Sequence, residues 1–143
     1  MRWIWALWAV AFAVSAAEVK QEVVGVTHLP AETVTAGFAK GVNLAKAANY
    51  RVEASRRDVA GEVEVHTKDT DIFYVTSGSA TFVTGGTLVG GREIAPDEIR
   101  GKDVTGGAAR HLAKGDVIII PAGTPHWFKE IQEPSTYFVV KVR

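Results

Sequence analysis

The stretch that decides the fold is GDVIIIPAGTPH, residues 115–126. Its run of Val and Ile at 117–120 has the composition of a buried β-strand. The Pro-Ala-Gly that follows at 121–123 is a turn signal, because proline and glycine fit turn geometry. His126 opens the next apolar run. The segment therefore predicts two neighbouring strands joined by a short turn, with a histidine at the start of the second strand.

A second segment, GEVEVH at residues 61–66, alternates strictly between polar and apolar residues. Successive side chains of a strand point to opposite faces, so Glu64 and His66 are expected on one face of this strand. Asp71 follows five residues after His66 and opens another predicted strand. If the strand that begins near His126 pairs with this region, two imidazoles and a carboxylate converge.

These segments resemble the two signature motifs of the cupin superfamily. The first motif is a glycine-bounded His-x-His-x(3–4)-Glu-x6-Gly, and the second is Gly-x5-Pro-x-Gly-x2-His-x3-Asn. The second motif matches at Gly115, Pro121, Gly123 and His126, and Glu130 stands at the usual Asn position.

The first motif fits the sequence in two registers. One reads Glu64-x-His66-x4-Asp71-x6-Gly78, and the other reads His66-x-Lys68-x2-Asp71. The first keeps the family spacing of four and leaves an oxygen ligand at each non-histidine position. The second shortens the spacing and places a lysine in the site, whose ammonium cannot bind a metal while protonated. We therefore adopt the first register.

The resemblance covers roughly residues 50–142 and implies an all-β fold, a small double-stranded β-helix barrel of the cupin or jelly-roll type. It implies that His66, Asp71 and His126 bind one divalent transition metal, with Glu64 at the remaining position of the first motif. Two imidazoles with carboxylates suit Fe, Mn or Zn, and the metal identity stays open.

The composition of the 143-residue chain excludes several classes of protein. Sixteen Lys and Arg balance sixteen Asp and Glu, and there is no long basic run, so nucleic acid is not an expected partner. The chain has no cysteine, which excludes disulfides and thiolate metal sites. Any metal must therefore be held by His, Asp or Glu.

The N-terminal residues 1–17 have the pattern of a secretory signal peptide. The apolar run 3–14 follows a positive charge and ends in small residues, and it is shorter than the roughly 20 residues that span a bilayer. We expect export to the periplasm or the medium, with no membrane association after cleavage. An N-terminal segment at 18–49, with a short helix over 30–40, then precedes the barrel domain at 50–143.

Short apolar runs separated by turn residues predict many strands, as a sandwich or barrel requires. Ser77-Gly78-Ser79 is typical of a hairpin turn. The segment 85–107 holds seven glycines and mixed charge, and is predicted to be a long loop. The expected strands are 50–55, 62–67, 72–77, 79–84, 109–113, 116–120, 125–130 and 136–142.

Two functions fit this pattern. The first is a metalloenzyme with oxygenase, isomerase or lyase chemistry on a small organic substrate, with Glu64 or Glu130 as general base. Glu130 is expected on the face of His126 because their spacing is even. The alternative is a non-catalytic module that binds a small molecule or a metal. An anionic substrate could be clamped by arginine, but at most one of the neighbours Arg56 and Arg57 can face inward.

The alternation also predicts a homodimer. If Glu64 and His66 face the interior, Val63 and Val65 face outward, and so does part of the run Ile118–Ile120. Contiguous exposed apolar surface is unusual in a monomer, so we expect a second subunit to cover these residues through isologous contacts.

Overall fold

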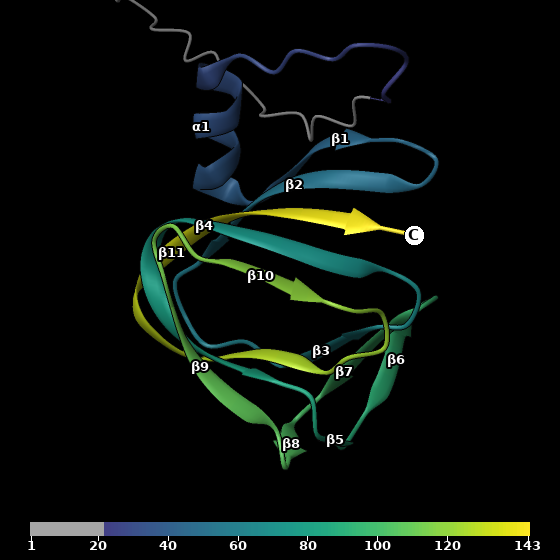
Figure 1. Ribbon diagram of the computed structural model, residues 1–143, viewed down its shortest axis with the longest axis vertical. Coiled ribbons are helices and arrows are strands. Elements are labelled where there is room, and N and C mark those ends of the chain that lie inside the picture. The colour runs from purple at the N-terminus through teal and green to yellow at the C-terminus, as the bar shows by residue number, and fades with distance from the viewer. Residues whose placement is uncertain (1–21) are drawn as a thin grey trace, which may run out of the picture.

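The computed structural model describes residues 22–143 and shows one helix packed on a curled, mostly antiparallel β-structure (Figure 1). The elements are α1 (Ala31–Lys40), β1 (Val42–Lys46), β2 (Tyr50–Arg57), β3 (Val63–His66), β4 (Thr70–Thr84), β5 (Thr87–Val89), β6 (Arg92–Ala95), β7 (Glu98–Gly101), β8 (Asp103–Thr105), β9 (Ala108–Ala113), β10 (Val117–Ile120) and β11 (His126–Val142).

The strands curl around a common interior, and two long strands lie at the centre of their pairing (Figure 1). β4 and β11 pair along most of their length, and the main sheet runs β1-β2-β11-β3-β7-β6. β10 pairs with the first half of β4, and β9 pairs with its second half. This arrangement confirms the predicted all-β barrel of jelly-roll type.

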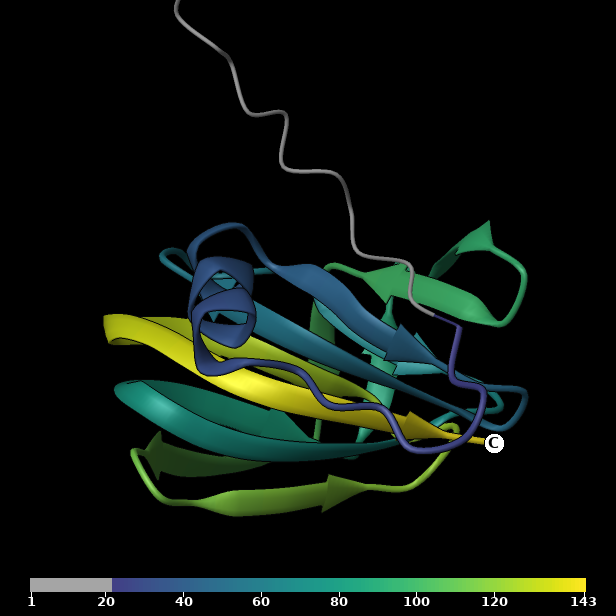
Figure 2. The same ribbon diagram turned by 90° about the horizontal axis from the view of Figure 1, so that it is seen from above.

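Helix α1 confirms the helix predicted at 30–40. Pro30 stands at its N-cap, where the missing amide hydrogen costs nothing, and Gly41 ends it with a positive φ of 71°. The helix lies on the outer side of the β2 and β11 layer (Figure 2). The Phe38 ring meets the Phe138 ring edge-on at a centroid distance of 4.9 Å, which fixes the helix on the sheet.

The predicted hairpin at Ser77-Gly78-Ser79 is wrong, because the chain continues through it as the single strand β4. Gly78 has a φ of 79°, and a Cβ atom there would lie 2.2 Å from the carbonyl oxygen of Pro134. The pairing of β4 with β11 also shifts register beside it, between Glu133 and Thr136. Gly78 is therefore the point at which β4 bends, between its first half, which pairs with β10, and its second half, which pairs with β9.

The predicted long loop at 85–107 is also wrong, since it contains four short strands. β5 pairs with β8 in a separate ribbon, and β6 pairs with β7. β7 then pairs with β3, and this places Arg100 opposite Glu64 and Glu98 opposite His66. A further strand that the sequence did not predict, β1, precedes residue 50. It pairs with β2 and adds one more strand to the edge of the main sheet.

The interior contains a cluster of aromatic rings. Phe82 is 0% exposed, and its ring centroid lies 4.7 Å from that of Phe128 and 5.8 Å from that of Phe73. Tyr137 closes the group at 5.0 Å from Phe128. Each such ring contributes about 1.5–3 kcal/mol through burial, so this cluster is a main source of stability.

The exposure of the outer faces changes the argument for a dimer. Val63 and Val65, which we expected to need a second subunit, are 0% and 6% exposed within a single chain. On β10, by contrast, Val117 is 60% exposed and Ile119 is 63% exposed. Only the β10 part of the predicted apolar surface therefore remains uncovered by residues 22–143.

One expectation about the N-terminus lies outside this description. The predicted signal peptide at 1–17 falls before residue 22, where the described structure begins. Within residues 22–143, no helix has the length and apolar character needed to cross a membrane.

Candidate metal centre

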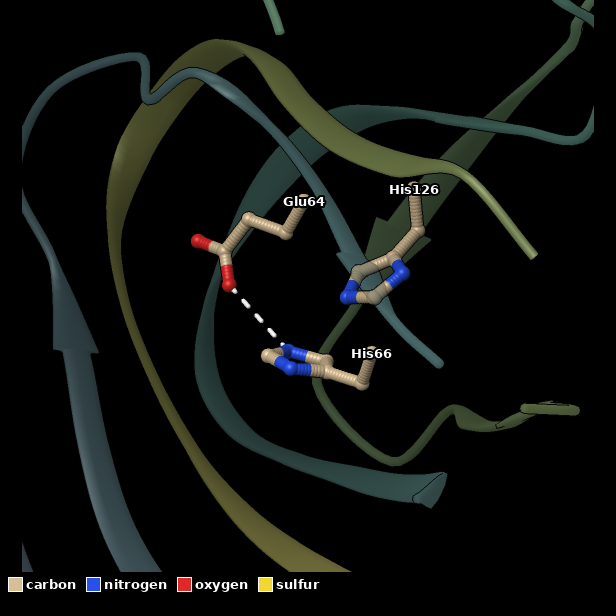
Figure 3. Close-up of side chains that lie close together, drawn as sticks. All are labelled: Glu64, His66 and His126. Atoms are coloured by element: carbon tan, nitrogen blue, oxygen red, sulfur yellow. Dashed lines mark ion pairs between the residues drawn. The ribbon is translucent and has the colours of Figure 1, made fainter. Parts of the chain in front are cut away.

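Three side chains of the predicted site converge inside the barrel. Glu64 and His66 lie on β3, and His126 opens β11, where it pairs directly with Glu64. One donor atom from each of the three lies within 4.8 Å of the others. Figure 3 shows the carboxylate and the two imidazoles pointing toward one another. The two motifs thus meet as the sequence predicted, because β11 returns antiparallel to β3.

His126 presents a fixed nitrogen to this space. Its Nδ1 lies 3.0 Å from the carbonyl oxygen of Thr124, which can only accept, so Nδ1 carries the hydrogen. Nε2 is therefore unprotonated in the neutral ring, and it has no hydrogen-bond partner among residues 22–143 although it is buried. Burial lowers the pKa of His126, despite the bond to Thr124, which favours the neutral ring.

His66 is 4% exposed and is held from both motifs. Its carbonyl oxygen accepts a hydrogen bond of 2.8 Å from the amide of Gly123, whose positive φ of 78° forms the turn before His126. Its Nε2 lies 3.5 Å from the Glu64 carboxylate and 3.5 Å from Asp71. Both ring nitrogens are buried without a hydrogen-bond partner in the described part of the chain.

Glu64 is held by two arginines. Arg57 donates to Oε1 at 2.5 Å, and Arg100 lies 3.5 Å from Oε2. Burial by itself would raise the pKa of Glu64, but the adjacent His66 imidazole, 3.5 Å away, and the charges of Arg100 and Arg57 outweigh it and lower that pKa to about 2. The carboxylate is therefore ionised at neutral pH and available as an oxygen donor.

Asp71 lies beside the three but already has a cationic partner. Its Oδ2 is 3.5 Å from Nε2 of His66 and 3.6 Å from Nε2 of His126. The same oxygen accepts a hydrogen bond of 2.8 Å from the ammonium of Lys141. Its Oδ1 is buried with no partner among residues 22–143. Asp71 thus faces both histidines and a lysine at once.

The donor set fits a divalent transition metal. Metal–nitrogen and metal–oxygen bonds of about 2.1 Å at tetrahedral angles put neighbouring donors about 3.4 Å apart. The separations of 3.5 and 3.6 Å that join Asp71 to His66 and His126 are close to that spacing. Buried imidazole nitrogens without hydrogen bonds are costly, and a metal ion would satisfy them. The residues present therefore fit the ion that the motif resemblance implies.

A small cavity of about 110 Å³ lies beside these donors, inside the barrel. Arg57, Tyr137 and Lys141 line it together with Glu64, Asp71 and His126. A larger cleft of about 920 Å³ shares Glu53 and Lys141 with the cavity. The cavity and the cleft therefore border each other at these two residues.

Glu130 is not part of this site. A register shift between Phe128 and Glu130 interrupts the alternation along β11, so the even spacing from His126 no longer means a shared face. Glu130 is exposed, and it accepts a hydrogen bond of 3.2 Å from the hydroxyl of Thr81. The expectation that Glu130 acts as a catalytic acid or base beside the metal is therefore not supported by its position.

The two neighbouring arginines separate as a strand requires. Arg56 is exposed and pairs with Asp58 at 2.7 Å, whereas Arg57 points inward to Glu64. Sequence reasoning missed the other cations of the site. Lys141 carried a signal, since it interrupts an inward-facing apolar series on β11, but Arg100 carried none because its segment was expected to be a loop.

Comparisons with known proteins agree with this architecture. The family model described as Cupin matches residues 39–142. Among solved structures, BH2720 of Bacillus halodurans has a TM-score of 0.55 at 16% identity, with 78% of this chain and 75% of that chain covered. The polyketide cyclase RemF of Streptomyces resistomycificus has a TM-score of 0.50 at 19% identity, with coverages of 71% and 63%. No curated protein matches the chain. At these identities the structural likeness shows the fold alone.

Proposed function

This chain belongs to the cupin family, and on that premise we propose that its barrel binds one divalent transition metal and acts on a small organic molecule. The metal would be held by Glu64, His66 and His126, with Asp71 as a fourth donor. The observation that supports this most strongly is the group of buried nitrogens, Nε2 of both histidines, that face two carboxylates and have no hydrogen-bond partner among residues 22–143.

The chemistry would depend on Fe, Mn or Zn, each of which suits imidazole with carboxylate. Such a cation polarises a carbonyl or an enolate, or activates dioxygen, when it is bound. Residues around the site keep the donor atoms in the form that binds a metal. Thr124 holds the His126 ring in the tautomer that leaves Nε2 free, and Arg57 and Arg100 keep Glu64 ionised.

Tyr137 supplies a neutral donor to the cavity. Burial raises the pKa of Tyr137 to about 12, against the opposing effect of Arg57, so its hydroxyl keeps its proton at neutral pH. Of the two predicted bases, Glu130 lies outside the site, and Glu64, with a pKa of about 2, is suited to bind the metal rather than to accept a proton at neutral pH. Isomerase, lyase or oxygenase chemistry would require the substrate to lie between the donors and Tyr137.

Metal analysis tests the metal site first. The purified parent protein should hold about one metal ion per chain, and His126→Ala should hold little or none, because it loses one of the two imidazole donors and leaves a single nitrogen ligand beside two carboxylates that already pair with cations. His111→Ala is the matched control, since His111 is an exposed histidine on β9. Equal metal content in His126→Ala and the parent would overturn the site.

A substrate screen with the metal found in the parent then separates enzyme from binding module. Turnover of a small organic compound that disappears in His126→Ala supports the enzyme. Saturable binding without turnover across the screen supports the alternative, a non-catalytic cupin module that holds a small molecule or a metal.

Export and dimerisation are proposed from separate observations. The pattern of residues 1–17 supports export, and N-terminal sequencing of the mature protein should then begin at Ala17 or Glu18; an intact Met1 in exported material would contradict it. The exposed Val117 and Ile119 support a homodimer through β10, which pairs only with β4 among the described strands.

A further inference from the structure

We infer that a small organic anion, of the size and chemistry of a simple carboxylate, binds in the interior cavity against Lys141 and Arg57, and that it does so only when the metal is bound. This inference rests on the proposed metal site. It adds the class of ligand, the residues that recognise it and the order in which metal and anion bind.

The metal donors are already neutralised before any metal binds. Lys141 donates to Asp71 at 2.8 Å, and Arg57 donates to Glu64 at 2.5 Å. Both carboxylates and the lysine lie in the barrel interior, where Asp71 is 1% exposed and Lys141 is 7% exposed. Each donor carboxylate is thus paired with a cation, and the second arginine beside Glu64, Arg100, also lies 3.8 Å from Glu98. An anion that entered would therefore meet no unpaired positive charge from these groups.

A divalent metal changes this balance. It adds two positive charges, and it competes with Lys141 for the same atom, because Oδ2 of Asp71 faces both histidines as well as the ammonium. The metal would likewise compete with Arg57 for the carboxylate of Glu64. Lys141 and Arg57 are then left with unused hydrogen-bond donors and uncompensated charge in a buried space, which is costly. An anion bound beside them and the metal offsets part of this added charge and gives Lys141 and Arg57 an acceptor.

The cavity has room for such a ligand in the required place. Its lining includes Lys141, Arg57 and Tyr137 together with three of the metal donors, Glu64, Asp71 and His126. Its volume of about 110 Å³ equals about four water molecules, since each takes about 30 Å³ in the liquid. Acetate, which has four non-hydrogen atoms, is therefore a suitable probe.

The outer cleft borders the cavity at Lys141, which lines both spaces. The cleft contains further cations, with Arg51 and Arg143 both paired to Asp69, at 3.5 and 2.7 Å. These arginines keep their carboxylate partner when the metal binds, whereas Lys141 does not, which makes Lys141 the specific anion contact.

Calorimetric titration of acetate tests the inference on the full mature chain. The protein is stripped of metal with a chelator, and one portion is reloaded with zinc and its zinc content measured. We expect acetate to bind the zinc-loaded protein at least tenfold more tightly than the metal-free protein. Acetamide, which has the same shape without the charge, should not bind either form measurably. By reciprocity, acetate should raise the zinc affinity by the same factor.

Variants of Lys141 locate the anion. Lys141→Met removes the charge and keeps the length of the side chain, and should weaken acetate binding at least tenfold while zinc is retained. Lys141→Arg should restore much of it. Lys68→Met is the matched control, because Lys68 is an exposed lysine with a similar ion pair, 3.1 Å to Asp97, away from the cavity.

The outcomes are separable. A parent protein that takes up no zinc overturns both the metal site and this inference. A parent that holds zinc but binds acetate no better than when metal-free, or binds acetamide equally well, overturns the inference alone. That comparison uses only the parent chain, so it decides the matter even if Lys141→Met fails to fold. Unchanged acetate binding in a folded Lys141→Met also overturns it.

Discussion

The barrel interior has a polar half and an aromatic half, and the strands β4 and β11 contribute side chains to both. On β4, Asp71 and Phe73 occupy successive inward positions, and on β11 the same is true of His126 and Phe128. One half therefore receives the charged and imidazole side chains and the other receives the rings. Phe73 and His126 meet at the border, with ring centroids 6.2 Å apart.

The halves differ in what they contribute. The aromatic half buries large apolar surface, which stabilises the fold. The polar half leaves buried nitrogens of His66 and His126 without hydrogen bonds among residues 22–143, which costs free energy. The comparison indicates that the rings stabilise the barrel while the polar half is kept ready for a ligand, and variants in each half test this division.

The largest effect on stability is expected in the aromatic half. Phe82→Ala removes a fully buried ring that contacts Phe73 and Phe128, and should lower the free energy of unfolding by about 3–5 kcal/mol. Urea denaturation of the metal-free protein measures it. Val59→Ala, at a side chain that is 73% exposed, should change stability by no more than about 0.5 kcal/mol. A loss below about 1 kcal/mol for Phe82→Ala would contradict the division.

The polar half should make the metal-free protein sensitive to acid. The pKa of Glu64 is lowered from 4.5 to about 2, so its contribution is present above pH 4.5 and is lost as the pH falls toward 2. The pKa of His126 is also lowered, so its contribution is present above 6.5 and declines below that pH. Stability should therefore fall continuously on acidification.

Glu64→Gln isolates the lower part of that acid transition. The Glu64 contribution is at most about 3 kcal/mol, at about 1.36 kcal/mol per pKa unit. Denaturation curves between pH 2 and 7 should show that Glu64→Gln flattens the profile below pH 4.5 and leaves the higher part in place. An identical profile for variant and parent below pH 4.5 would show that the arginines do not stabilise the ionised form of Glu64.

Metal binding in the polar half should increase the stability of the folded protein. Zinc at 100 times its dissociation constant should raise the free energy of unfolding by about 2.7 kcal/mol, because it binds the folded state. His126→Ala should gain nothing, whereas Val59→Ala should gain as much as the parent. Thermal and urea denaturation with and without zinc provide the measurement. Equal stabilisation of His126→Ala and the parent would place the zinc elsewhere.

The smallest effect on folding stability is expected for the exposed side chains on the outer face of β10. Ile119→Lys places a charge on the proposed dimer face, where the side chain is 63% exposed, and should shift the protein from dimer to monomer at micromolar concentration. The stability of the monomer itself should change by no more than about 0.5 kcal/mol. Val89→Lys, at an apolar residue on β5 that is 43% exposed, is the control. Sedimentation of the parent at monomer mass throughout would contradict the dimer.

Local sequence patterns were sufficient to predict many of the strands, the helix and part of the site. The Val and Ile run at 117–120 and the Pro-Ala-Gly turn predicted β10 and the position of His126, because strand and turn preferences act over a few residues. The strict alternation of 61–66 likewise predicted that Glu64 and His66 share a face, which the convergence of their donor atoms with His126 agrees with.

Two of the errors share one physical source, which is irregular pairing between distant strands. A register shift places Glu130 outside, and the bend at Gly78 turns an expected hairpin into a strand corner. Neither is visible in a local pattern, because an extra residue in one strand reverses the alternation only relative to its partner.

The sequence by itself determined the family motifs, the fold class and the histidines of the site, since these depend on residue type and short spacing. Only the tertiary structure decided which cation neutralises each carboxylate. Lys141 reaches Asp71 across 70 positions, and Arg100 reaches Glu64 through the pairing of β7 with β3. The physical reason is that a charge pair depends on distance in space, and sequence spacing along a strand defines a side chain's face but not the neighbour opposite it.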